Sequence, residues 1–78
     1  MKKIRIMIYV LELEEEGDYD DNYQRPTEVI AASIDKNKLQ LKVDNFKSFI
    51  RERDNTKLFI YQGNEYIDYN IYKVDLIE

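Results

Sequence analysis

The chain has 78 residues, a net charge of −4, and no cysteine or histidine. A domain of this length buries only about 60 % of the surface of its unfolded chain, so a deep substrate cavity is not expected. Without cysteine or histidine the sequence excludes disulfides, thiol nucleophiles, imidazole bases and the usual zinc sites. Apolar residues make up 44 % of the chain and include ten aromatic residues. This composition predicts a single domain, residues 1–78, with one core and no cofactor.

Residues 2–13 alternate in the way that is typical of a β-strand. One face carries Ile4, Ile6, Ile8 and Val10. The other face is also mostly apolar beyond Arg5, which favours a central position in a sheet. The longest uninterrupted apolar stretch here, residues 6–11, is too short for a signal-peptide core with its cleavage site or for a membrane span. We therefore expect a cytoplasmic protein.

Acidic residues dominate the next segment, with seven acids among the ten positions from Glu12 to Asp21. Hydrophobic periodicity stops there, so residues 12–25 are predicted to form an exposed loop or a protruding hairpin tip. Pro26 then bars regular pairing, and residues 27–34 resume a strand pattern.

Residues 35–52 are compatible with two interpretations. Leu39, Val43, Phe46 and Ile50 follow helical spacing, which predicts one helix over residues 36–53 capped by Ser33 or Asp35. Residues 39–43 also alternate strictly, and residues 35–38 have the composition of a hairpin turn. We favour the hairpin, followed by a shorter helix that is capped by Asp44 and runs to about Arg53.

The last third of the sequence predicts a hairpin, with strands over residues 57–62 and 66–77 and a turn at Gly63-Asn64. A change in the parity of the apolar residues predicts a bulge around residues 68–70. The expected fold is α+β, a small antiparallel sheet of four to five strands with one helix. The favoured order is β-β-β-α-β-β and the alternative is β-β-α-β-β. Periodicity predicts this core: Ile6, Ile8, Val10, Ile30, Phe46, Ile50, Ile60 and Val74.

Sequence motifs for metal binding and catalysis are incomplete. Asp18, Asp20 and Asn22 have the first ligand spacing of a calcium loop, but Tyr23 replaces its glycine and Val29 its final glutamate. A catalytic carboxylate pair would need an enclosing cleft, and most of the acids lie in one exposed run. We expect neither a metal site nor enzymatic activity.

Charge is unevenly distributed along the chain. Residues 11–35 contain nine acids and one base, whereas residues 36–57 contain seven bases and three acids. Tyrosines within the acidic run have the amphipathic character of interface anchors. The predicted partner-binding residues are Glu14, Glu15, Glu16, Asp18, Tyr19, Asp20, Asp21 and Tyr23. They favour a protein partner with a basic surface, although solubility alone would also explain such a run.

The size of the chain and its acidic run Glu12–Asp21 resemble the small inhibitors encoded by phages and mobile elements, including anti-CRISPR proteins and DNA mimics. The resemblance implies a target such as a nuclease complex in the host cytoplasm, but the basic stretch from Lys36 to Lys57 departs from most DNA mimics. Two alternatives stay open. The favoured element order matches that of an OB-fold, which implies single-stranded nucleic-acid binding through Tyr and Lys. An accessory subunit, pairing with itself as a homodimer or with another chain, is the third interpretation.

Overall fold

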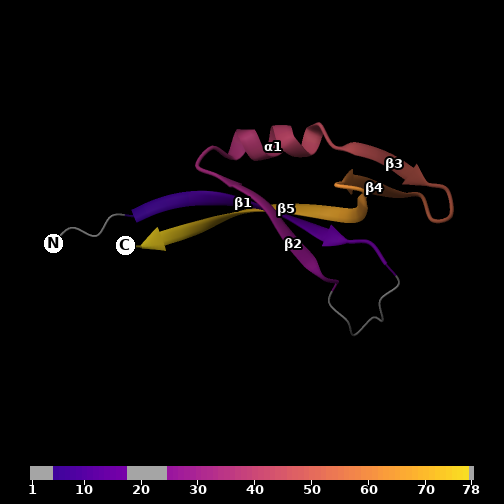
Figure 1. The fold of residues 1–78 in the computed structure, drawn as a ribbon, viewed down its shortest axis with the longest axis horizontal. Helices are drawn as coiled ribbons and strands as arrows, with labels where there is room; N and C mark the ends of the chain where they lie inside the picture. Colours follow the sequence, from indigo (N-terminus) through magenta and orange to yellow (C-terminus); the bar gives the residue numbers. More distant parts are fainter. Residues whose placement is uncertain (1–4, 18–24, 78) are drawn as a thin grey trace.

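The computed structural model describes residues 5–17 and 25–77, which form five strands and one helix (Figure 1). The elements are β1 (Arg5–Glu15), β2 (Thr27–Ser33), α1 (Lys36–Asp44), β3 (Lys47–Arg51), β4 (Thr56–Tyr61) and β5 (Asn64–Ile77). All strand pairs are antiparallel, and the order across the sheet is β2-β1-β5-β4-β3. The structure confirms the predicted α+β class, with a small antiparallel sheet and one helix.

The favoured hairpin over residues 35–43 is wrong, because Lys36–Asp44 is helical. Asp35 is the N-cap, and its Oδ1 accepts a hydrogen bond of 2.9 Å from the backbone N–H of Asn37. The helix buries Leu39 and Val43 one turn apart and leaves Leu41 59 % exposed. The alternation that indicated a strand therefore had one apolar residue pointing to solvent.

The helix predicted over residues 44–53 is also wrong, because Lys47–Arg51 is strand β3. Asp44 is the last residue of α1 rather than a cap, and Asn45 ends the helix by donating to the carbonyl of Leu41. β3 pairs along its whole length with β4. The observed element order is β-β-α-β-β-β, which matches neither predicted order.

β1 is a central strand, as predicted, with β2 on one side and β5 on the other. β5 is shared between two parts of the sheet: it pairs with β1 from Tyr66 to Ile77 and with β4 only from Asn64 to Tyr66. The register with β1 shifts between Glu14 and Glu15, which leaves Ile67 as the extra residue. This irregularity lies just before the predicted bulge at residues 68–70.

A two-residue turn, Gln62-Gly63, joins β4 to β5, since Tyr61 pairs with Asn64. Both turn residues have positive φ, 51° at Gln62 and 80° at Gly63. Such a turn matches the right-handed twist of the strands that it connects. The predicted turn at Gly63-Asn64 is therefore displaced by one residue.

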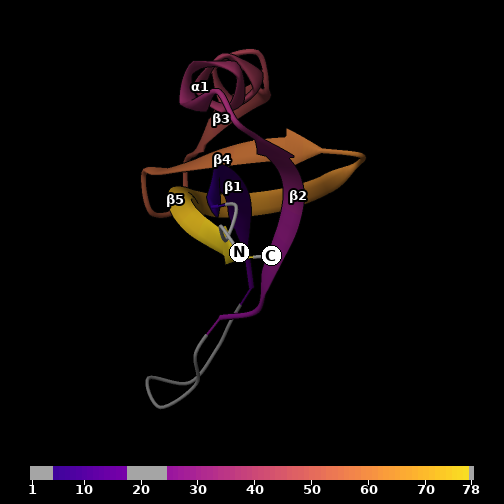
Figure 2. The same ribbon diagram turned by 90° about the vertical axis from the view of Figure 1, so that its left-hand side faces the viewer.

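The core lies between α1 and the adjacent face of the sheet. Its buried cluster consists of Leu11, Leu13, Leu39, Val43 and Tyr66. Figure 2 shows α1 as a layer of its own beside the strands. Of the predicted core, Val10 is buried, Ile30 and Phe46 pack against the cluster, and Ile8, Ile60 and Val74 are half-buried. Ile6 and Ile50 are exposed, which contradicts the prediction for those two residues.

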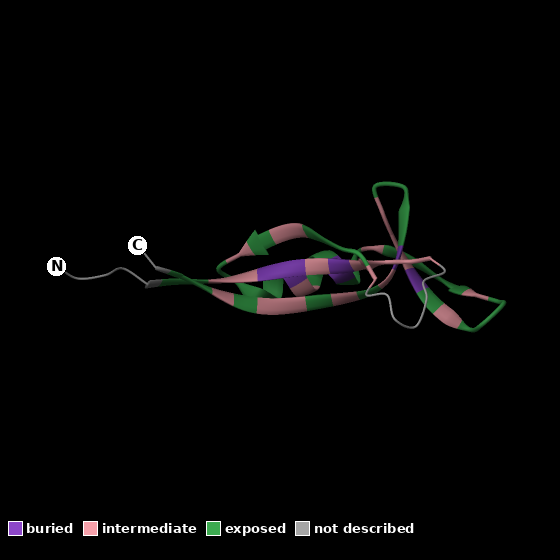
Figure 3. Cartoon of the chain, turned by 90° about the horizontal axis from the view of Figure 1, so that it is seen from below, coloured by how far each residue is buried: buried purple, intermediate pink, exposed green. Residues whose placement is uncertain are grey.

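The face of β2, β1 and β5 opposite the helix is open, and we call it the open face. Seen from that side, the three strands lie in front of α1, and no other helix or strand of the described residues covers them (Figure 3). Paired residues in antiparallel strands point to the same face. The pairs Ile6–Leu76, Ile8–Val74 and Val10–Tyr72 therefore make one half of the open face apolar. None of the helices in the described residues is long and apolar enough to cross a membrane.

Candidate functional site

The acidic run begins inside a strand and not in a loop. β1 extends to Glu15, so the predicted loop over residues 12–25 is wrong for its first four positions. The run does connect two paired strands, since the N–H of Glu15 donates to the carbonyl of Pro26 at 2.9 Å. The predicted partner-binding residues Asp18, Tyr19, Asp20, Asp21 and Tyr23 lie outside the described residues. The structure therefore places three of the predicted residues, Glu14, Glu15 and Glu16.

Strand geometry puts Glu12 and Glu14 on the open face. Glu14 pairs with Asp68 of β5 and with Thr27 of β2, and Glu12 pairs with Asn70. These residues line a shallow hollow of about 210 Å³. Because neighbouring strands hold paired side chains close together, three carboxylates share a small area there.

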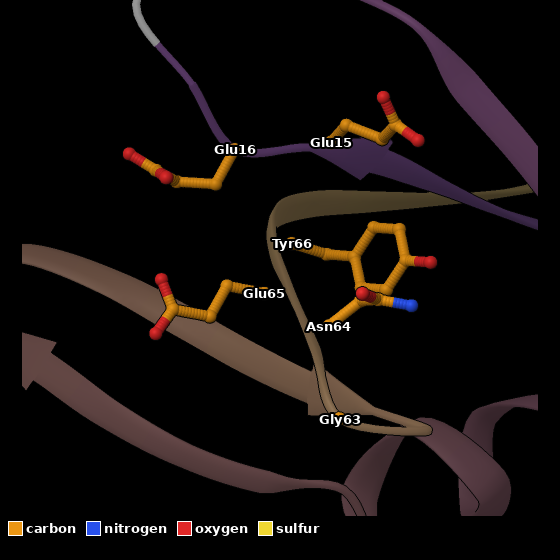
Figure 4. A pocket seen from close by; sticks show the side chains of 6 residues that line it. All are labelled: Glu15, Glu16, Gly63, Asn64, Glu65 and Tyr66. Carbon is orange, nitrogen blue, oxygen red and sulfur yellow. The ribbon is translucent and has the colours of Figure 1, made fainter.

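Glu15 and Glu16 line a second hollow, of about 350 Å³, at the point where β1 meets the β4–β5 turn (Figure 4). Glu65 contributes a third carboxylate, and its backbone carbonyl accepts a hydrogen bond of 3.3 Å from the N–H of Glu16. In Figure 4 the side chains of Glu16 and Glu65 lie on the same side of the hollow, and Glu15 lies on the other. The two hollows lie on opposite faces of the sheet at the same end of β1. We call the carboxylates of both hollows the acidic surface; its members are Glu12, Glu14, Glu15, Glu16, Glu65 and Asp68.

Two arginines lie beside the acidic surface. Arg51 of β3 forms an ion pair with Glu16 and a bidentate one with Asp54, at 3.0 and 2.6 Å. Hydrogen bonds to Asp54 and Glu16 raise the pKa of Arg51 above its usual value, and the bond from Arg51 holds the pKa of Asp54 well below its own. Arg25 donates to the backbone carbonyls of Gly17 and Glu15, at 2.9 and 3.5 Å.

Glu16 is therefore the one member of the acidic surface with an ion pair among the residues that the structure describes. The single positive charge of Arg51 is shared by two carboxylates, those of Glu16 and Asp54. The acidic surface thus keeps most of its negative charge uncompensated within the described part of the fold.

Tyr66 also lines the second hollow. It is buried, and its hydroxyl donates to Oε2 of Glu28 at 2.7 Å. This hydrogen bond and burial raise the pKa of Tyr66 to about 12. A phenol that stays protonated to high pH and donates to the Glu28 carboxylate ties β5 to β2, which is a structural role.

The described residues contain no group of three or more side chains arranged to hold a metal ion. Sequence reasoning missed Glu65 and Asp68, which the register of β5 brings beside the acidic run from about fifty residues away. The only available signal was that both follow the turn that leads into the last strand.

Two lysines lie over aromatic rings of β4. Lys42 Nζ sits 5.7 Å from the ring centre of Tyr61, and Lys57 Nζ sits 5.2 Å from that of Phe59. Tyr61 also contacts Phe46 with ring centres 5.4 Å apart.

Comparison of the chain with protein-family models, with curated proteins and with solved structures finds no match.

Proposed function

We propose that this protein is a small protein-binding module whose acidic surface binds a basic surface on a partner. The observation that carries the proposal is the gathering of six carboxylates, five from β1 and β5 and one from Glu16 just after β1, around two hollows, with one ion-paired member among the described residues. Keeping like charges together raises the energy of the folded chain. A partner that supplies lysine and arginine relieves this repulsion and associates faster because opposite charges attract at long range.

The proposed target is the nucleic-acid-binding groove of a nuclease or a similar complex, as in the phage-encoded inhibitors that the sequence resembles. Glu12 and Glu14 are two residues apart on one strand, which spaces them about 7 Å from each other. This separation is comparable with that of successive phosphates along a nucleic-acid strand. A strand that presents carboxylates at this interval mimics the charge spacing of a phosphate backbone, and binding requires no catalytic group.

The test is affinity capture from a host lysate with two variants that lose the same charge. The first, Glu12→Gln with Glu14→Gln, weakens the acidic surface; the control, Asp44→Asn with Glu52→Gln, removes two exposed acids elsewhere. The wild type and the control should retain the same basic protein, with binding that weakens as salt rises. The first variant should lose it. Equal retention of that protein by both variants at low salt would refute the proposal.

Single-stranded nucleic-acid binding is the second candidate, and the lysines stacked over Tyr61 and Phe59 favour it. Its basis in an OB-fold order no longer holds, because the observed order is β-β-α-β-β-β. The test is a gel-shift assay with a labelled single-stranded oligonucleotide. If the wild type and the Glu12 and Glu14 variant retard the oligonucleotide and the double variant Lys42→Gln with Lys57→Gln does not, this candidate is favoured over the first.

A further inference from the structure

Along most of its length, one edge of β5 has no strand beside it among the described residues. Tyr66 pairs with Glu15 of β1 on one side and with Phe59 of β4 on the other. Beyond Tyr66, β5 continues to pair with β1, but its pairing with β4 ends. From Ile67 to Ile77 the edge that faces away from β1 therefore lacks a partner among the described residues. In Figure 3, β5 forms the border of its part of the sheet.

This edge has the properties of a pairing site. An unpaired strand edge presents a row of backbone N–H and C=O groups that another strand can satisfy. The edge is long, contains no proline, and is flanked on the open face by the apolar residues Tyr72, Val74 and Leu76. Leu76 is 44 % exposed. The helix-side face of the same stretch carries Lys73 and Asp75, opposite Tyr9 and Met7.

The sequence from Ile71 to Ile77 is complementary to itself when read antiparallel. If Val74 lies opposite Val74 of a second copy, Lys73 lies opposite Asp75 of that copy, and Asp75 lies opposite its Lys73. The same register places Tyr72 opposite Leu76 and Ile71 opposite Ile77. Opposite charges and apolar pairs that face each other directly stabilise antiparallel strands.

Neighbouring registers that keep the two sheet faces aligned lose this match. Centring the pair on Lys73 places the two lysines against each other, and centring it on Asp75 does the same for the two aspartates. Centring it on Tyr72 sets Lys73 opposite Ile71. Like charges directly opposite destabilise a strand pair. Charge complementarity therefore selects one occupant, a second copy of this chain, and one register.

We propose that the protein forms a two-fold homodimer in which the free edges of β5 pair antiparallel, centred on Val74. The dimer contains one continuous sheet in the order β2-β1-β5-β5-β1-β2, with both copies of α1 on the same face. Asp75 also has an interaction within its own chain. A carboxylate accepts several hydrogen bonds, so Lys73 of the second copy adds to that interaction.

The dimer would also give the proposed function two binding sites. Asp68 is six residues from Val74, about 20 Å along the strand, so the two acidic surfaces lie about 40 Å apart. A partner with two basic sites at that separation would be bound more tightly than one site allows. This consequence rests on the proposed function, whereas the dimer itself does not.

Charge exchange tests the register. Lys73→Asp alone and Asp75→Lys alone each place like charges opposite, whereas the double variant Lys73→Asp with Asp75→Lys restores both pairs in exchanged form. Lys38→Asp on the exposed side of α1 has the same change in charge as Lys73→Asp and serves as the control. Sedimentation equilibrium over about a hundredfold range of concentration measures the dimer, since the short interface belongs to the weak class.

The wild type, the control and the double variant should dimerise, and each single variant should be monomeric with an unchanged circular dichroism spectrum. If the wild type is still monomeric in sedimentation equilibrium at the highest protein concentration measured, the proposal is overturned. It is also overturned if the single variants dimerise as the wild type does.

Cross-linking provides an independent readout, because the chain has no cysteine of its own. Directly paired residues have Cβ atoms about 4.5–5.5 Å apart, which is near the range that a disulfide bridges. Under mild oxidation Val74→Cys should cross-link to itself. Tyr72→Cys and Leu76→Cys should each stay monomeric alone and cross-link when mixed. Self-linking of Tyr72→Cys without any linking of Val74→Cys would refute the register.

Discussion

The two faces of β1 should differ sharply in their contribution to stability. Leu11 is fully buried beneath α1, and Ile8 lies three residues away on the open face, where its side chain is half-buried. A buried Leu→Ala change costs about 2–5 kcal/mol, because transfer energy is lost and a cavity is left. At Leu11 we expect about 3–4 kcal/mol, since Leu13, Leu39 and Val43 surround it within the same cluster.

At Ile8 the same truncation should cost about 1 kcal/mol, because solvent reaches the site and no closed cavity forms. Urea unfolding followed by circular dichroism measures both values. A domain of this size has a total stability of only about 4–12 kcal/mol, so Leu11→Val, expected to cost about 1 kcal/mol, provides a milder variant that stays folded. If Ile8→Ala proved as costly as Leu11→Ala in monomeric protein, the assignment of the core to the helix side would be wrong.

Three further changes test local interactions. Tyr66→Phe should cost about 1–2 kcal/mol because a hydrogen bond to the Glu28 carboxylate is lost. Since the pKa of Tyr66 is raised to about 12, this contribution is complete below about pH 10 and disappears as the pH rises through 12, so the wild-type advantage in unfolding experiments should vanish there. Asp35→Ala should lower stability by about 1 kcal/mol through loss of the N-cap of α1, and Asp35→Asn should restore most of it in thermal melts. Gln62→Asn should raise the melting temperature slightly, because asparagine adopts the positive φ of this turn more readily; a lower melting temperature would contradict the turn geometry.

The strands that the sequence predicts best are those with strong patterns and clear boundaries. β1, β2, β4 and β5 lie close to their predicted ranges, because alternation or a continuous apolar run marks each of them. The prediction for the region from Asp35 to Arg51 is wrong because helical and strand periodicities are both present there. Leu39 and Val43 fit a helix, and the intervening Leu41 creates a false alternation.

β3 was missed because its pairing with β4 is a tertiary property. Phe46, Phe49 and Ile50 have helical spacing, and only the partner strand reveals that Lys47–Arg51 is extended. The prediction that the face of β1 with Ile6 and Ile8 forms the core was wrong for a related reason. Both faces are apolar, and the position of α1 decides which one is buried.

Only the local part of the candidate site was visible in the sequence. Seven acids within ten residues are obvious, but the division of Glu12, Glu14 and Glu15 between two faces follows from the extension of β1 to Glu15. Glu65 and Asp68 join them through the register of β5, which no local pattern encodes.

The pairing of β1 with β5 has a consequence for how the chain folds. Arg5 lies opposite Ile77, so the first strand and the last are neighbours at the centre of the sheet. Among the described strands β1 is synthesised first and β5, with which it pairs over the greatest length, is synthesised last. Contacts this distant in sequence form slowly, because a long loop must close before they stabilise anything. Until then the apolar stretch Ile6–Leu11 is exposed and can aggregate with other unfolded chains. Rapid dilution of the denatured protein, or binding of a chaperone, should therefore raise the yield of folded protein.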